Sequence, residues 1–221
     1  MKNIISSLKD NSSRVLHRKK TTIFFQGEVP RHALYILDGV VRAYSISNNG
    51  DECIEEFYTR GDILPPGWLN NHSTTCLFYY DAMTDVRALT ISKDTFWRLL
   101  ESKPTLLQEY TQYLSKEYTS LLLRINGLNQ SRAIDKISYT LYYLLFLYGR
   151  CLQENSYMID LRLSQTSLAQ LIGQTRESTA KNIKILKNKG IINYRSSIYT
   201  VDKAKLEKFM GEDSFRDIDL T

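Results

Sequence analysis

The stretch from Leu163 to Ile192 reads LSQTSLAQLIGQTRESTAKNIKILKNKGII and carries the signals of two short helices joined by a tight turn. Ser164 stands where an N-cap oxygen is needed, and Gly173 can adopt the positive φ that ends the first helix. Thr175 is the expected N-cap of the second helix, and Gly190 follows its end. The pattern predicts a helix-turn-helix.

The second of these helices has two different faces. At about 100° per residue, Thr179, Ile183 and Leu186 fall on one side and can pack inward. The other side of the helix and the turn before it supply the candidate DNA-binding residues. These are Gln174, Thr175, Arg176, Glu177, Lys181, Lys184 and Asn188. Arginine and lysine donate to guanine edges and glutamate accepts from cytosine N4, so this face suits reading of a major groove. The alternative is an ordinary solvated helix with pairs such as Glu177 with Lys181.

Two β-prone runs follow, at residues 191–195 and 198–201, and Ser196-Ser197 separates them. They predict a short hairpin and, with the helices, a winged helix. Residues 164–210 contain nine Lys or Arg against three Asp or Glu, whereas the whole chain has a net charge of only +5. The positive charge is therefore concentrated where the phosphates of double-stranded DNA would lie.

The composition is that of a globular protein with one large or two modest domains, because 221 residues with 43% hydrophobic content can form real cores. Cys53, Cys76 and Cys151 are odd in number and widely spaced, which argues against a disulfide framework or a zinc site. The N-terminus lacks the apolar core of a signal peptide, and the richest apolar run, 137–148, is too short to span a bilayer. We expect a cytoplasmic protein without a membrane partner.

The first part of the chain, residues 19–91, has β texture. Short β-prone runs at 22–25, 33–37, 40–46, 53–58, 77–80 and 86–91 are separated by turn pairs such as Asp38-Gly39, Asn49-Gly50 and Gly61-Asp62. Many short strands at such spacing predict a sandwich or barrel, here a double-stranded β-helix or jelly roll.

Helical texture follows from Ser92 to Leu128. Residues 92–95 can cap a short helix through Leu100, and Pro104 suits the first turn of a long one. Apolar residues three or four apart continue along the long helix: Leu107, Tyr110, Leu114, Tyr118, Leu121, Ile125 and Leu128. Such spacing favours a homodimer seam. Packing against the chain's own β domain is the alternative.

The remaining segments complete an α+β fold class with three parts. Residues 129–131 break the helical pattern as a hinge, and Asn129 is a candidate cap for a helix ending near Tyr148. A loop at 154–156, a small strand at 157–159, a helix at 204–210 and an acidic, frayed tail at 211–221 are expected. The predicted parts are a jelly-roll domain at 1–103, a dimerisation helix at 104–128 and a winged helix-turn-helix domain at 129–221.

In this order of parts the chain resembles the CRP/FNR family of bacterial transcription regulators over nearly its whole length. Three stretches carry the resemblance: Ile23–Glu28 with Leu34–Arg42, Phe57–Asp62, and Leu168–Lys181. The resemblance implies a homodimer that binds a palindromic DNA site, with RNA polymerase as a further partner. It also implies base contacts by Arg176, Glu177 and Lys181. Many members have Arg where this chain has Lys181, which lacks the bidentate fork.

The resemblance implies a sensory domain, but the cyclic-nucleotide pattern is missing. Where cyclic-nucleotide members have Gly-Glu and Arg-Ser, this chain has Pro65-Pro66 and, on a less secure alignment, Cys76-Leu77. No Lys or Arg occurs from Ile63 to Val86, so a cyclic phosphate would be buried without a counter-charge. We predict no cyclic AMP binding and no cofactor.

The same region is aromatic. A pocket for a small apolar effector is one hypothesis, lined by Pro65, Pro66, Trp68, Phe78, Tyr79 and Tyr80, with Met83 nearby. The alternative for each of these residues is an ordinary position in the jelly-roll core. A third hypothesis is that the protein acts without any effector. His72 and Cys76 are weak candidates for haem or redox ligands, and no N-terminal cysteine cluster exists for an iron–sulfur centre.

A function of a different class is also compatible with a β-rich domain. The chain could be a small-molecule-binding or cupin-like enzyme whose C-terminal domain serves interaction only. Against it, His32 and His72 stand alone, and neither a metal-ligand cluster, a Ser/His/Asp set nor a Gly-rich phosphate loop is visible. We therefore expect a regulator with no catalytic and no metal-binding residues.

Overall fold

The computed structural model describes Ile4 and residues 6–7 and 12–211. The chain divides into two compact units, residues 1–115 (unit 1) and 116–221 (unit 2). The division falls inside helix α4 (Pro104–Leu128), so the two halves of this helix belong to different units. The predicted α+β fold class is confirmed, whereas the predicted domain limits remain predictions.

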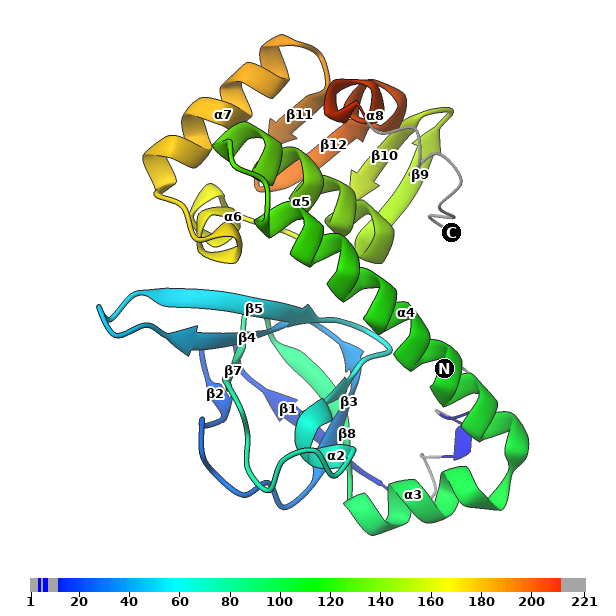
Figure 1. Ribbon diagram of the computed structural model, residues 1–221. Helices are drawn as coiled ribbons and strands as arrows, with labels where there is room; N and C mark the ends of the chain where they lie inside the picture. Colours follow the sequence, from blue (N-terminus) through cyan, green and yellow to red (C-terminus); the bar gives the residue numbers. More distant parts are fainter. Residues whose placement is uncertain (1–3, 5, 8–11, 212–221) are drawn as a thin grey trace. The chain divides into compact units, whose positions relative to one another are not determined.

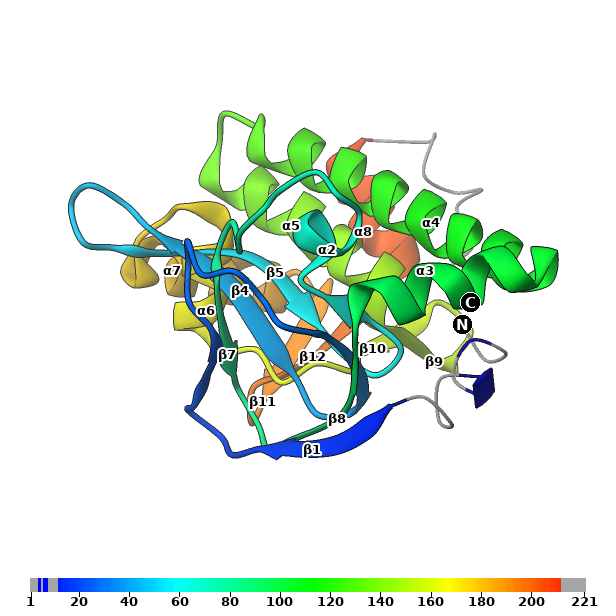
Figure 2. The same cartoon turned by 90° about the horizontal axis from the view of Figure 1, so that it is seen from below.

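Unit 1 is built on two antiparallel four-stranded sheets. Its strands are β1 (Ser13–His17), β2 (Thr22–Phe24), β3 (Ala33–Asp38), β4 (Val41–Ile46), β5 (Glu52–Tyr58), β6 (Ile63–Leu64), β7 (Tyr79–Ala82) and β8 (Val86–Ile91). One sheet has the order β1-β8-β3-β6 and the other the order β2-β7-β4-β5. Figure 2 shows β1 along the outer edge of its sheet. This arrangement is the predicted jelly roll.

Strand β3 shows how the sheets create two cores. Leu34 and Ile36 pack between the sheets with Tyr80, whereas Tyr35 packs on the other side with Phe96. Alternate residues of a strand point to opposite faces, so β3 is buried on both. The turn after it needs glycine, because a Cβ at Gly39 (φ 99°) would lie 2.4 Å from a backbone oxygen.

Helices cover the outer face of the first sheet. They are α2 (Pro66–Leu69), α3 (Lys93–Ser102) and the first half of α4. The Ser92 side chain accepts a hydrogen bond from the backbone N of Thr95 at 3.2 Å, which confirms the predicted cap of α3. Phe96, Leu100 and Leu106 pack there against the sheet. Sequence reasoning missed α2.

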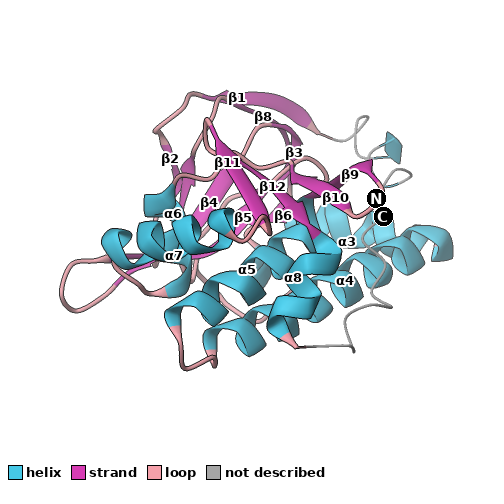
Figure 3. Ribbon diagram, turned by 90° about the horizontal axis from the view of Figure 1, so that it is seen from above, coloured by secondary structure: helices cyan, strands magenta, loops and turns pink. Residues whose placement is uncertain are grey.

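Unit 2 combines a small sheet with four complete helices among its described residues. Its elements after α4 are α5 (Ala133–Tyr148), β9 (Gly149–Gln153), β10 (Ser156–Ile159), α6 (Gln165–Ile172), α7 (Arg176–Asn188), β11 (Ile192–Arg195), β12 (Ile198–Asp202) and α8 (Lys203–Met210). The strand order is β11-β12-β10-β9. Helices α5 and α8 lie against one side of this sheet (Figure 3). The predicted winged helix fold is confirmed.

One sequence-based expectation in unit 2 was wrong, and one strand was missed. Asn129 does not cap α5, because its backbone N still donates to Ile125 O in the last turn of α4, and Arg132 occupies the N-cap position without a side-chain cap bond. Strand β9 was not predicted, since it forms by pairing with β10 and all its residues after Gly149 are exposed. The predicted tail lies, beyond Gly211, outside the described residues.

Candidate nucleic-acid interface

The turn between α6 and α7 is fixed by local hydrogen bonds. Ser164 Oγ accepts from the backbone N of Ser167 at 3.0 Å at the start of α6, and Gly173 ends that helix in the left-handed region at φ 62°. Thr175 Oγ1 then accepts from the backbone N of Ser178 at 3.2 Å. These bonds confirm both predicted N-caps and the predicted turn.

Helix α7 is held by the face that the periodicity identified. Thr179 and Leu186 are fully buried and Ile183 is 3% exposed, and the helix packs against α5 and α6 (Figure 1). Thr179 Oγ1 donates to Thr175 O at 3.0 Å, which satisfies the one polar group in this row. The position of α7 within unit 2 is therefore set by buried contacts.

The opposite face of α7 is open to solvent. Of the candidate DNA-binding residues, Gln174 is half-buried and the others are exposed, namely Thr175, Arg176, Glu177, Lys181, Lys184 and Asn188. Gln174 accepts from Ser178 Oγ at 3.3 Å. The alternative pair of Glu177 with Lys181 is not formed, and within the described residues the charged groups of this face have no ion-pair partner. The structure thus leaves their donors and acceptors available to a ligand.

The wing adds a second exposed element beside the helices. Ser196 and Ser197 both have positive φ, 52° and 64°. A two-residue hairpin turn needs this conformation at both positions to match the right-handed twist of its strands. The rings of Tyr194 and Tyr199 lie 4.6 Å apart across the hairpin. Exposed Arg195 stands next to the turn, and sequence reasoning counted its charge but did not name it as a site residue.

The basic charge of unit 2 is divided between paired and unpaired groups. Lys203 and Lys205 on α8 form ion pairs with Glu207 and Asp202, at 3.5 Å and 2.9 Å. These pairs offset the charges of Lys203 and Lys205, whereas Lys208 on the same helix stays exposed. On α7 and at the wing, Arg176, Lys181, Lys184 and Arg195 are exposed and have no ion-pair partner among the described residues, so they can attract an anionic backbone.

The apolar row of α4 is exposed in most of its length. Leu107, Leu114, Tyr118, Leu121 and Ile125 are between 38% and 64% exposed, and Leu128 is half-buried. Large apolar side chains in a continuous exposed row indicate an interface. The prediction of a dimer seam stays a prediction for these residues.

Tyr110 was wrongly assigned to that seam. It is 2% exposed, belongs to the core of unit 1, and donates its hydroxyl hydrogen bond to Asn70 Oδ1 at 2.9 Å. Burial raises the pKa of Tyr110 to about 12. At this position the alternative, packing against the chain's own β domain, is correct.

The six residues proposed to line one effector pocket are not brought together. Trp68 belongs to the core outside the first sheet, whereas Tyr80 belongs to the core between the sheets, with Phe78 against it. Tyr79 points to the other face of its strand and stacks on Tyr44 at 5.3 Å. Pro65 is buried and Pro66 half-buried at the start of α2. The single aromatic pocket was therefore wrong, because strand alternation and the two cores separate its members.

The weak redox candidates also lie in different surroundings. His72 is exposed, whereas Cys76 is buried, and burial raises the pKa of this thiol to about 12. A thiol with such a pKa stays protonated and is a poor ligand or nucleophile. Nowhere in the described part of the chain do three or more His, Cys, Asp or Glu residues gather as a metal site would need. No helix there combines the length and apolar character that crossing a bilayer requires.

Comparison with known families gives two consecutive matches. Residues 14–103 match the family model of the cyclic nucleotide-binding domain, and residues 140–209 match that of the Crp-like helix-turn-helix domain. The two matches cover the jelly roll and the winged helix unit, and together they account for most of the chain.

Whole proteins with the same arrangement are also similar. The chain is 24% identical to the nitrogen fixation regulation protein FixK of Bradyrhizobium diazoefficiens, over 88% of this chain and 80% of that one. It is 22% identical to the listeriolysin regulatory protein of Listeria monocytogenes, over 83% of this chain and 78% of that one. A CooA mutant from Carboxydothermus hydrogenoformans has the same fold, with a TM-score of 0.75 and 20% sequence identity. The superposition covers 93% of this chain and 90% of that one.

Proposed function

The chain belongs to the CRP/FNR family of DNA-binding transcription regulators, and we propose that it acts as a homodimer that reads a two-fold symmetric DNA site with α7. The observation that supports this most strongly is the exposed face of α7. Its charged side chains have no ion-pair partners among the described residues, while its other face is buried. A rigid helix with free donors and acceptors is what entry into a major groove requires.

We assign different roles to the residues of this face. Arg176 in the first turn presents a guanidinium fork suited to guanine, and Glu177 beside it can accept from cytosine N4. Lys181 follows on the same side as a third base contact. The remaining candidates, Gln174, Thr175, Lys184 and Asn188, and also Arg195 at the wing, are assigned to the DNA backbone, whose phosphates set the register of binding.

The homodimer is proposed from the exposed row of α4. Covering Leu114, Leu121 and Ile125 with the same residues of a second chain removes apolar surface from water on both copies at once. Two α7 helices then face two half-sites, about 34 Å apart on one side of the duplex. RNA polymerase is the further partner that a transcription regulator implies.

The jelly roll has lost cyclic-nucleotide binding in this proposal, although it matches that family model. Between the sheets, the rings of Phe24 and Tyr58 both contact Tyr80, at 5.9 Å and 5.8 Å between centroids, and all three are at most 4% exposed. These side chains occupy the interior, and residues 63–86 supply no cation for a phosphate. Titration calorimetry with cyclic AMP should give no saturable heat, and tight binding would contradict this part of the proposal.

The proposal is tested by selection of DNA from a random duplex pool. The purified chain, without added ligand, is incubated with the pool, and bound duplexes are amplified and sequenced. We expect a palindromic consensus, and we expect the Arg176→Ala, Lys181→Ala double variant to give none. A consensus without two-fold symmetry would reject the dimeric reading, and equal enrichment by the double variant would reject the role of α7.

A further inference from the structure

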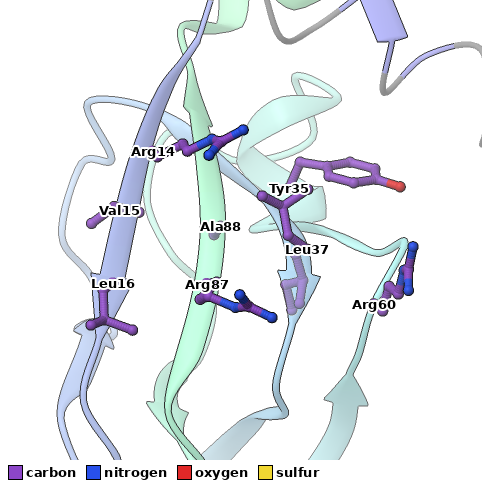
Figure 4. A pocket seen from close by; sticks show the side chains of 9 residues that line it. Arg14, Val15, Leu16, Tyr35, Leu37, Arg60, Arg87 and Ala88 are labelled. Carbon is purple, nitrogen blue, oxygen red and sulfur yellow. The ribbon is translucent and has the colours of Figure 1, made fainter.

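A pocket lies on the outer face of the first sheet of unit 1, away from the core between the sheets. It encloses about 540 Å³. Strands β1, β3 and β8 form its floor, and the turn after β5 forms one wall. Its lining consists of Arg14, Val15, Leu16, Tyr35, Ile36, Leu37, Arg60, Arg87 and Ala88 (Figure 4). This volume is in the range of small-molecule sites.

Three arginines give the pocket a basic character. Arg14 and Arg87 extend from neighbouring strands to the same side of the sheet, and Arg60 rises from the turn after β5 (Figure 4). Arg14 lies opposite Leu89 on the neighbouring strand, so Arg14 and Arg87 are diagonal neighbours. Residues in this relation stand about 7–8 Å apart across a strand pair. Like charges at this separation repel, so an anion between them would relieve an unfavourable arrangement.

The cations are available to a ligand. The guanidinium groups of Arg14 and Arg60 form no hydrogen bond or ion pair with any described residue. Arg87 donates to Asp38 at 2.9 Å, but both side chains are more than half exposed. An exposed pair of this kind is weak, so it can exchange its carboxylate for that of a ligand.

A buried hydroxyl without a partner supports the same conclusion independently. Tyr35 is 1% exposed, lines the pocket, and has no hydrogen-bond partner for its hydroxyl among the described residues. In Figure 4 its ring extends away from Arg14 and Arg87, and its hydroxyl lies on the side of the sheet edge where Arg60 stands. Buried hydroxyl groups in folded proteins are almost always hydrogen-bonded. A donor left open beside an arginine suits a carboxylate or phosphate oxygen.

The nearby acidic groups are already engaged. Burial raises the pKa of the Tyr35 hydroxyl most, the charges of Asp62 and Glu109 raise it further, and the charge of Arg60 opposes them. Asp62 accepts from the backbone N of Thr59 at 2.6 Å, and Glu109 accepts from that of Ile4 at 3.2 Å. The Tyr35 hydroxyl therefore stays protonated as a donor, and the two carboxylates have partners of their own.

We propose that this pocket binds a small organic anion. Its carboxylate or phosphate group lies among Arg14, Arg60 and Arg87 and accepts from the Tyr35 hydroxyl, and its apolar part lies on Leu16 and Leu37. Arginine forks recognise both kinds of oxyanion bidentately. The site is separate from the core between the sheets, and it does not depend on the proposed reading of DNA.

Calorimetry with two simple probes tests the site. Benzoate and phenyl phosphate each combine one anionic group with one ring, and benzyl alcohol is the uncharged control. We expect saturable binding of at least one anion to the full-length chain and none of benzyl alcohol. Arg60→Gln and Arg14→Gln should each weaken binding about tenfold. The matched control is Arg31→Gln, which changes an exposed arginine outside the pocket and should leave the affinity unchanged.

Tyr35→Phe separates a ligand contact from a structural role. The hydroxyl has no bond to lose in the free protein, so the melting temperature without ligand should not fall, whereas affinity for the anion should fall about tenfold. The proposal is overturned if neither anion binds saturably, or if Arg31→Gln weakens binding as much as the pocket variants. Binding of an acidic peptide alone, with the same arginine dependence, would also overturn it and would identify a protein-docking surface.

Discussion

Helices α7 and α4 carry apolar side chains at the same spacing, yet these side chains end in different surroundings. In α7 the row of Thr179, Ile183 and Leu186 is at most 3% exposed, because α5 and α6 cover it. In the row of α4, by contrast, Leu121 is 45% exposed and Ile125 is 52% exposed. Periodicity therefore predicts that a face will be covered, but it does not say by what.

The difference extends into α4 itself. Leu106 and Tyr110 are buried in the core of unit 1, while Leu107 between them is 45% exposed. The buried side chains belong to folding of the single chain. The exposed row has no cover within the described residues, and a second copy is the partner we propose for it. Substitutions in the two rows should accordingly disturb different properties.

The largest effect is expected from charges in the α4 row. The Leu121→Glu, Ile125→Glu double variant places four carboxylates in the proposed dimer interface and should leave a folded monomer. Without joint engagement of two half-sites, affinity for the selected palindrome should fall about a thousandfold, roughly 4 kcal/mol. Sedimentation and a DNA-binding titration measure the two effects.

A matched control is available on the same helix. Gln108 and Gln112 are exposed on the side of α4 away from the row, so Gln108→Glu with Gln112→Glu adds the same charge elsewhere. This control should remain dimeric. If both double variants dissociate equally, the effect is one of net charge and the seam is wrong.

The next effect is expected in the buried row of α7. Leu186→Ala removes a fully buried side chain and should lower the free energy of unfolding of unit 2 by about 3 kcal/mol. The oligomeric state of the folded fraction should not change, which separates this row from that of α4. Urea denaturation measures the loss. Lys187→Ala, one residue further and exposed, should stay within about 0.5 kcal/mol of the wild type.

A smaller effect is expected on the exposed face of α7. Arg176→Ala should cost about 1–3 kcal/mol in binding to the selected site and relax selectivity at one base position. Its stability should not change, since the side chain is exposed. Titrations with the selected site and with random duplex of equal length measure this. An equal loss on both would show that Arg176 contacts phosphate and not a base.

The smallest effect is expected from Lys184→Ala. If this side chain contacts phosphate, binding should weaken about threefold for each chain, similarly on all sequences. The slope of log affinity against log salt should also become shallower by about 1 for each lysine removed. A loss confined to the selected site would move Lys184 into the group that reads bases.

The features of the site that could be predicted from the sequence are those made by near neighbours. Ser164, Gly173 and Thr175 act on residues within one helical turn, so caps, turn and helix ends follow from a few positions. The hairpin at Ser196-Ser197 is local in the same sense. The two faces of α7 also follow, because helical geometry fixes which residues share a side.

The errors concern contacts between distant segments. Tyr110 is buried among distant residues of the unit 1 core such as Tyr35, and its hydroxyl donates to Asn70, forty positions away, so no local pattern carries that information. Strand β9 exists because β10 pairs with it. The separation of Tyr79 from Tyr80 was predictable, since adjacent strand residues face opposite sides. The basic pocket was not, because Arg14, Arg60 and Arg87 meet only through the strand order.

The most direct test of the central claim is the number of chains on one DNA site. A duplex carrying the selected consensus is saturated with the protein, and the mass of the complex is measured by sedimentation at equilibrium. We predict two chains of 25.7 kDa on each duplex, bound together without a singly occupied species at intermediate concentrations. One chain on each duplex at saturation would contradict the dimer and leave the exposed row of α4 without its proposed partner.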